Sequence, residues 1–170
     1  MVKHVSPLNS TASAAADEAL RDTIAAFEAA FPGRVRGYYV EGSYADGTGI
    51  ATSDVDLTVV FRGAFRDEAE RSQAGRLGDE RAARSALELD VEVVDEARLA
   101  GGVKPTFKEG SRLVYGEDIR DRLPLLPIDA WARDRLHAAY WLLVKALCTQ
   151  TAPSRRPQRR PRGVPAGSRR

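Results

Sequence analysis

The strongest chemical signal in the sequence is a pair of aspartates two residues apart. Asp54 and Asp56 lie in the run DVDLTVVF, whose β-branched residues predict a strand over 54–61. Successive strand side chains point to opposite faces, so both carboxylates are expected on one face, with Val55 and Leu57 on the other. Two carboxylates a few ångströms apart repel each other, and a divalent cation reverses that interaction. Mg²⁺ suits this role because it prefers hard oxygen ligands.

A Gly-Ser pair ends the preceding predicted strand, over 35–40, and could contact phosphate. A glycine at position 42 lets backbone N–H groups approach a phosphate closely, and the hydroxyl of Ser43 adds a donor. Such pairs are also common in ordinary turns. The acids have a plainer interpretation as well, in which they keep the solvated face of a sheet polar.

A third group of acids follows in the run LELDVEVV, which predicts a strand over 87–94. Glu88, Asp90 and Glu92 are expected on one face, about 6.6 Å apart along the strand. Because Mg²⁺ ligands lie at about 2.0–2.1 Å, one of the three is expected to be the ligand. Asp90 is favoured over Glu92, since its shorter side chain loses less rotamer freedom on a metal.

The run GSYADGTGIATSDVDLTVVF resembles the signature of the polymerase-beta-like nucleotidyltransferase superfamily. In both, about ten residues separate the serine from a hydrophobic-flanked Asp-x-Asp, and a third acid opens a later hydrophobic run, as Asp90 does. SRLVYGEDIRDRLP, over 111–124, is similar to bacterial stand-alone members. The resemblance covers about 15–124. It implies an α/β (α+β) nucleotidyltransferase fold, a small mixed sheet flanked by helices.

The resemblance also implies roles for individual residues. Gly42 and Ser43, with Ser53, would bind the nucleotide. Asp54, Asp56 and Asp90 would bind Mg²⁺, and Asp90 would help to deprotonate an acceptor hydroxyl. The substrate would be an NTP, with ATP expected, and pyrophosphate would leave. The acceptor stays open between a small molecule of the aminoglycoside type and a protein hydroxyl.

Three further functions remain open. The chain could be an antitoxin-like nucleotidyltransferase that modifies a partner toxin, an alternative that its small size and the absence of an expected second domain favour. It could instead be a catalytically impaired module of the same fold that binds a partner protein. Nonspecific nucleic-acid binding through the basic C-terminal segment is the last alternative, since arginines contact phosphates without reading bases.

The remaining elements are predicted from apolar spacing. A helix is expected over 14–31, and a second over 64–86 that is broken near Gly75 and Gly78. A short helix and then a short strand around 113–115 should follow the third predicted strand. We interpret Lys104 and Lys108 as solvated side chains rather than phosphate ligands, and His4 and His137 as incidental.

A long amphipathic helix is predicted over 129–147, with Asp129 as its N-cap. It carries Trp131, Tyr140 and Trp141, which are interpreted as packing residues. The lone Cys148 can form no internal disulfide and is interpreted the same way. The apolar face of this helix needs cover, which a second copy of the chain or a partner protein would supply.

Composition divides the chain into four parts. We expect a flexible N-terminus over 1–13, the catalytic domain over 14–124, the C-terminal helix over 125–150 and a disordered tail over 151–170. The tail holds seven arginines and no acid, so the first 150 residues carry 19 basic against 24 acidic side chains. Few apolar residues there can offset the entropy of ordering. A natural basic tail and an altered gene end, which would cut a helical region short, both fit.

The sequence also limits where the protein works. No apolar run approaches the roughly 20 residues that span a bilayer. The first residues contain no continuous apolar segment of a secretory signal. We therefore expect a cytoplasmic protein without membrane contact.

Overall fold

The computed structural model of the protein describes residues 9–50 and 52–150. These residues form two compact units, and the boundary between the units lies between Trp131 and Ala132. The tail that we expect to be disordered lies outside the described residues, as does His4.

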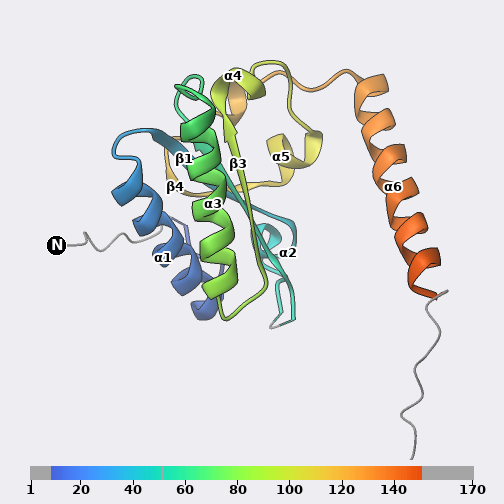
Figure 1. Cartoon of the computed structure of the whole chain (residues 1–170), viewed down its shortest axis with the longest axis horizontal. Helices are drawn as coiled ribbons and strands as arrows, with labels where there is room; N and C mark the ends of the chain where they lie inside the picture. The colour runs from blue at the N-terminus through green and yellow to red at the C-terminus, as the bar shows by residue number, and fades with distance from the viewer. Residues whose placement is uncertain (1–8, 51, 151–170) are drawn as a thin grey trace, which may run out of the picture. The chain divides into compact units, whose positions relative to one another are not determined.

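A four-stranded mixed sheet forms the centre of the first unit (Figure 1). Its strands are β1 (Val35–Glu41), β2 (Val55–Phe61), β3 (Leu89–Asp95) and β4 (Arg112–Gly116), in the order β3-β2-β1-β4. The central strands β1 and β2 are antiparallel, β4 is antiparallel to β1, and β3 is parallel to β2. The predicted small mixed sheet flanked by helices is confirmed.

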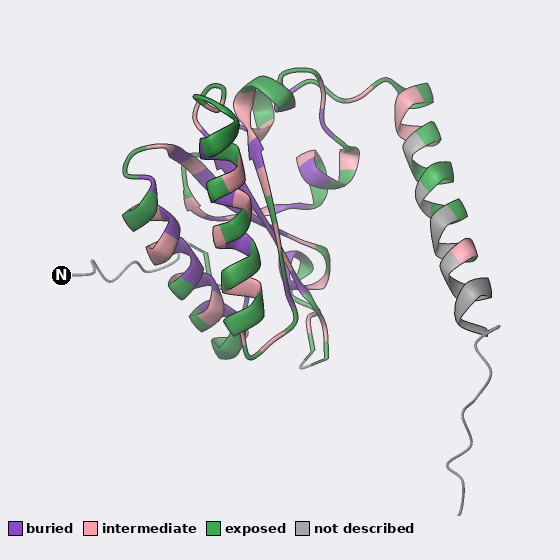
Figure 2. Cartoon of the chain, in the orientation of Figure 1, coloured by how far each residue is buried: buried purple, intermediate pink, exposed green. Residues whose placement is uncertain are grey.

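Two long helices, α1 (Ala14–Ala30) and α3 (Glu68–Arg84), cover one face of this sheet. Leu20, Ile24 and Phe27 repeat at helical spacing on α1 and are fully buried. They share one hydrophobic core with alternate residues of β2, which are Val55, Leu57, Val59 and Phe61. In Figure 2 the strands are largely buried, whereas the outward side of α3 is exposed. The period of two in β2 therefore fixes which of its residues face these helices.

The opposite face of the sheet is covered over its apolar part only. Tyr39, Val60 and Val94 form a second hydrophobic core there. It is completed by residues from α4 (Glu96–Leu99), α5 (Pro105–Gly110) and the segment around η1 (Arg120–Arg122), namely Leu99, Val103, Phe107, Ile119 and Leu123. The next residues on this face are Glu41 on β1 and Glu92 on β3, and Thr58 followed by Asp56 on β2, so the acids lie beyond this apolar cover.

Helix α3 is continuous, so the break predicted near Gly75 and Gly78 was wrong. Asp67 caps the helix by accepting a hydrogen bond from the backbone N–H of Glu70 at 2.7 Å. A β-carbon on Gly78 would lie 3.1 Å from Val91 Cγ1, so this glycine lets α3 approach β3 closely. Gly78 thus allows close packing of α3 on β3 without interrupting the helix.

The turn-rich segment after β1 holds a short helix that the sequence analysis missed, α2 (Gly42–Asp46). A left-handed residue, Gly47 with φ 73°, ends it. The Gly-Ser pair therefore stands at the first turn of α2, directly after β1.

The last helix, α6 (Ile128–Gln150), begins one residue before Asp129. Asp129 therefore lies within the first turn, and its predicted N-cap role was wrong. Leu136, Tyr140 and Leu143 recur at helical spacing and are 73%, 60% and 60% exposed. Among the described helices, none combines the length and the apolar character needed to cross a membrane.

The two glycines of α3 predict opposite effects on stability. Gly78→Leu should lower the free energy of unfolding by about 1–3 kcal/mol, because the side chain would push α3 away from Val91. Gly75→Ala should raise it by roughly 0.5–1 kcal/mol, since no atom lies within 4 Å of a β-carbon there and alanine is the better helix former. Urea denaturation of both variants measures the difference. Equal stability of Gly78→Leu and the wild type would contradict the close approach.

Candidate active site

Strand register brings three carboxylates into one row across the sheet. Asp56 on β2 is paired with Glu41 on the antiparallel strand β1 and with Asp90 on the parallel strand β3. Directly paired residues place their side chains on the same face, a few ångströms apart. Asp54 lies one residue before the first residue of β2, where it is exposed. The structure thus brings the three sequence-predicted aspartates to one corner of the sheet.

The electrostatics of Asp56 show that these carboxylates influence one another. Partial burial raises the pKa of Asp56, and the negative charges of Asp54 and Asp90 raise it further. The side chain cannot move to the other face, because its neighbours Val55 and Leu57 are buried in the core. The packing of β2 therefore holds Asp56 in unfavourable electrostatic surroundings.

Glu41 joins the three predicted aspartates as a fourth acid of this site, which the sequence analysis did not assign. Its Oε1 accepts a hydrogen bond from the Thr58 hydroxyl at 3.1 Å. The pKa of Glu41 is raised, mainly by burial and further by the charges of Glu92 and Asp56. The hydrogen bond from Thr58 and the charge of Lys104 act in the opposite direction. The predicted strand ended at residue 40. Extending its period of two by one residue would have placed Glu41 on the acidic face.

Gly42 lies directly beside the acids. Its φ is 65°, a left-handed conformation that favours glycine, and a β-carbon there would lie 3.2 Å from Asp56 Oδ2. Ser43 follows in the first turn of α2, and its carbonyl accepts a hydrogen bond from the Thr48 N–H at 2.9 Å. The Gly-Ser pair and the aspartates are therefore neighbours in space.

Ser53 holds the loop that leads to Asp54. Its hydroxyl accepts a hydrogen bond from the backbone N–H of Ile50 at 3.1 Å, and its own N–H donates to the Ile50 carbonyl at 2.9 Å. The buried Tyr44 donates its hydroxyl to the same carbonyl at 2.9 Å. A β-carbon on Gly49 would come within 2.5 Å of the Tyr44 ring, so the loop closes tightly over it. This contact set positions Asp54; the predicted nucleotide contact of Ser53 stays a prediction.

The two lysines considered as phosphate ligands have different surroundings. Lys108 is half-buried and donates a hydrogen bond from Nζ to the carbonyl of Leu123, so its interpretation as a solvated side chain was wrong. Lys104 is exposed, and its charge acts on Glu41. Lys108 therefore supports the fold, whereas Lys104 lies near the acids.

The donor set suits a magnesium ion in type. Aspartate oxygens are the hard ligands that Mg²⁺ prefers, and a cation would offset the burial and the charges of Asp54 and Asp90 that raise the pKa of Asp56. Within residues 9–50 and 52–150, however, no group of three or more acidic, histidine or cysteine side chains is already gathered closely enough to hold a metal ion. The aspartates are thus near one another, but their carboxylates are not placed closely enough to share a metal ion.

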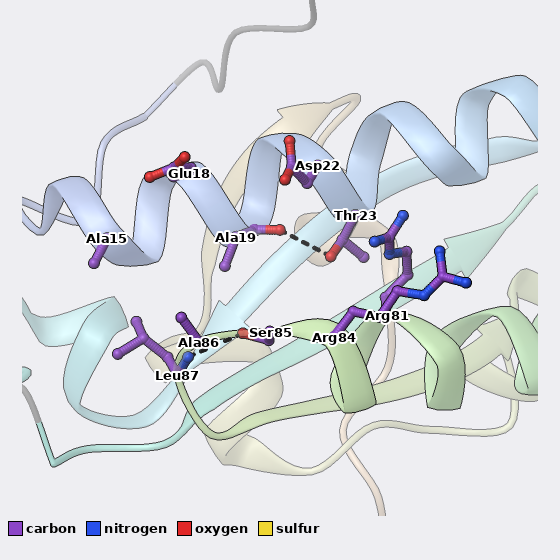
Figure 3. A pocket seen from close by; sticks show the side chains of 10 residues that line it. All are labelled: Ala15, Glu18, Ala19, Asp22, Thr23, Arg81, Arg84, Ser85, Ala86 and Leu87. Atoms are coloured by element: carbon purple, nitrogen blue, oxygen red, sulfur yellow. Dashed lines mark hydrogen bonds between the residues drawn. The ribbon is translucent and has the colours of Figure 1, made fainter.

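A cavity of about 230 Å³ lies elsewhere, between α1 and the C-terminal end of α3 (Figure 3). Its charged lining residues are Glu18 and Asp22 from α1 and Arg81 and Arg84 from α3. It contains none of the predicted site residues, and it lies on the helix-covered side of the sheet. The acidic row lies on the other face, with Asp90 exposed and Glu41 and Asp56 half-buried.

The repulsion at Asp56 predicts a pH-dependent gain from removing its charge. A raised folded-state pKa means that the native state holds the proton more tightly than the unfolded state. Stability is therefore lost as the pH rises from the ordinary value of 3.8 through the raised pKa. Without metal, Asp56→Asn should melt higher than the wild type at pH 7 and match it near pH 3. Asp79→Asn, an exposed charge-matched change on α3, is the control for melting curves. A lower melting temperature for Asp56→Asn at pH 7 would contradict the repulsion.

Comparison with known proteins adds the family. The model of a family described as nucleotidyltransferase domain matches residues 20–147. Among solved structures, a protein described as a nucleotidyltransferase from Sulfolobus solfataricus is similar at 20% identity, covering 68% of this chain and 96% of that one, with a TM-score of 0.40.

Two toxin–antitoxin structures are also similar. One, solved with AMP-PNP, is 17% identical over 75% of this chain and 93% of that one, with a TM-score of 0.38. The other, a tri-AMPylated HEPN toxin with an MNT antitoxin from Shewanella oneidensis, is 14% identical over 79% and 94%, with a TM-score of 0.39. No match was found among curated proteins. Since the family model spans most of the chain, from α1 into α6, the protein belongs to the nucleotidyltransferase domain family and is a nucleotidyltransferase.

Proposed function

We propose that the protein transfers a nucleoside monophosphate from an NTP, with ATP expected, onto an acceptor hydroxyl and releases pyrophosphate. The observation that carries this proposal is the register that sets Asp56 beside Asp90, next to a Gly42 whose backbone approaches Asp56 closely. A β-carbon added to this glycine would lie 3.2 Å from Asp56 Oδ2. A turn suited to phosphate and a carboxylate row thus share one corner of the sheet, as phosphoryl transfer requires.

Each residue has a part in this reaction. Gly42 and Ser43 bind the outer phosphates through backbone N–H groups and the hydroxyl. Asp54, Asp56 and Asp90 would hold two Mg²⁺ ions, which would supply charge to stabilise the attacking and leaving oxygens. Asp90 accepts the proton of the acceptor hydroxyl. The hydroxyl oxygen then bonds to the α-phosphorus, and the bond from this phosphorus to the oxygen of the leaving pyrophosphate breaks.

The strand pairing supports Asp90 rather than Glu92 as the third ligand. Asp90 is in register with Asp56, whereas Glu92 is in register with Thr58, two residues further along. Two residues correspond to about 6.6 Å along a strand. Glu92 therefore lies beside Thr58, whose hydroxyl donates a hydrogen bond to Glu41.

A protein acceptor is the alternative that one observation favours. The exposed stripe of Leu136, Tyr140 and Leu143 on α6 is a surface of the kind that binds another protein. Under this alternative, the chain is an antitoxin-like enzyme that modifies a hydroxyl of its partner protein. A small-molecule acceptor would leave the stripe without a role in substrate binding.

The proposal predicts a ranked loss of transfer activity. Asp54→Asn and Asp56→Asn should each abolish transfer, and Asp90→Asn should lower its rate by about a hundredfold or more, as expected for removal of a proton acceptor. Glu92→Gln and the surface control Asp79→Asn should change it little. Transfer of α-labelled NTP onto a cell lysate, at saturating Mg²⁺ and NTP, measures all five. A larger loss in Glu92→Gln than in Asp90→Asn would move the third ligand to Glu92.

A further inference from the structure

Lys104 immediately precedes α5, which packs on β1, the strand that ends in Glu41. The Phe107 ring packs on Tyr39, with ring centroids 5.1 Å apart. Tyr39 and Glu41 lie two residues apart on β1 and so share a face. Lys104 is the N-cap residue of α5, three residues before Phe107, and has an extended backbone conformation. With Phe107 packed on Tyr39, Lys104 lies close enough to Glu41 for its charge to act on that carboxyl.

The backbone at Lys104 is fixed, although its side chain is exposed. The carbonyl of Lys104 accepts hydrogen bonds from the N–H groups of Phe107 and Lys108, at 3.0 and 3.1 Å. The preceding residue, Val103, is buried and exchanges two 2.9 Å backbone hydrogen bonds with the 124–126 segment. The position of the lysine is therefore set by the fold, and the ammonium group extends from a rigid base.

The same helix also lies against α2, whose first turn carries Gly42 and Ser43. The helix that begins after Lys104 therefore contacts both the strand that carries Glu41 and the turn proposed to bind the outer phosphates. A triphosphate brings several negative charges to a corner that is otherwise acidic. Lysine binds phosphate as a point charge with three donors.

We propose that Lys104 is a nucleotide-binding residue that contacts the outer phosphates of the NTP. This inference rests on the proposed function and adds a cationic group to the site. The competing role is local, in which Lys104 only balances the charge of Glu41. The two roles differ in one respect: a phosphate contact discriminates a triphosphate from a monophosphate, and a local charge balance does not.

The test compares ATP and AMP binding by isothermal titration, with Mg²⁺ and without acceptor. Lys104→Ala should weaken ATP binding by about tenfold or more, the loss expected for one charge-assisted contact. AMP binding should stay unchanged, and Lys104→Arg should recover much of the ATP affinity. Arg76→Ala, which removes an exposed positive charge from α3 on the other side of the sheet, is the matched control and should have no effect.

Unchanged ATP affinity in Lys104→Ala would overturn the inference, as would an equal loss for ATP and AMP. Both results leave the proposed function standing, because the wild type still binds ATP. A wild-type protein that binds no ATP in the presence of Mg²⁺ would overturn the proposed function and the inference together.

Discussion

The alignment of Glu41, Asp56 and Asp90 across three adjacent strands is the constraint on which the site depends. Like charges in such a row repel, and the pKa of Asp56 is raised first by its partial burial and then by the charges of Asp54 and Asp90. The fold tolerates it because Val55 and Leu57, on either side of Asp56, are buried against α1 and α3. A slip of one residue in β2 would bury the acids and expose the core residues, so hydrophobic packing fixes the carboxylates.

The second face of the sheet divides into a covered part and an open part. Tyr39, Val60 and Val94 are buried beneath α4, α5 and the segment around η1, and the acids follow where the cover ends. The apolar part holds α5 in place through Phe107, and α5 in turn brings Lys104 to the edge of the open part. The same packing contacts therefore position both the acids and Lys104 near the turn proposed to bind the outer phosphates.

The sequence predicted which side chains share a face of a strand better than it predicted which strands pair with one another. A period of two in β2 and β3 was enough to put Asp56 and Asp90 on polar faces, because alternation is a local property. The pairing of Asp56 with Asp90 and with Glu41 depends on strand order and register, which no local pattern states. The glycines of α3 indicated a break, because the approach of Val91 that favours Gly78 is tertiary. Lys108 was misjudged for the same reason, since its partner, the Leu123 carbonyl, is fifteen residues away.

The central claim is that the acidic row binds the nucleotide through a divalent cation. Its most direct test is the melting temperature of the wild type and of Asp56→Asn, each with ATP and increasing Mg²⁺. Binding to the native state raises stability by RT ln(1 + [L]/Kd), so the wild type should melt higher as Mg²⁺ is added. Asp56→Asn should show little further rise. Equal Mg²⁺-dependent rises in both proteins would contradict the account.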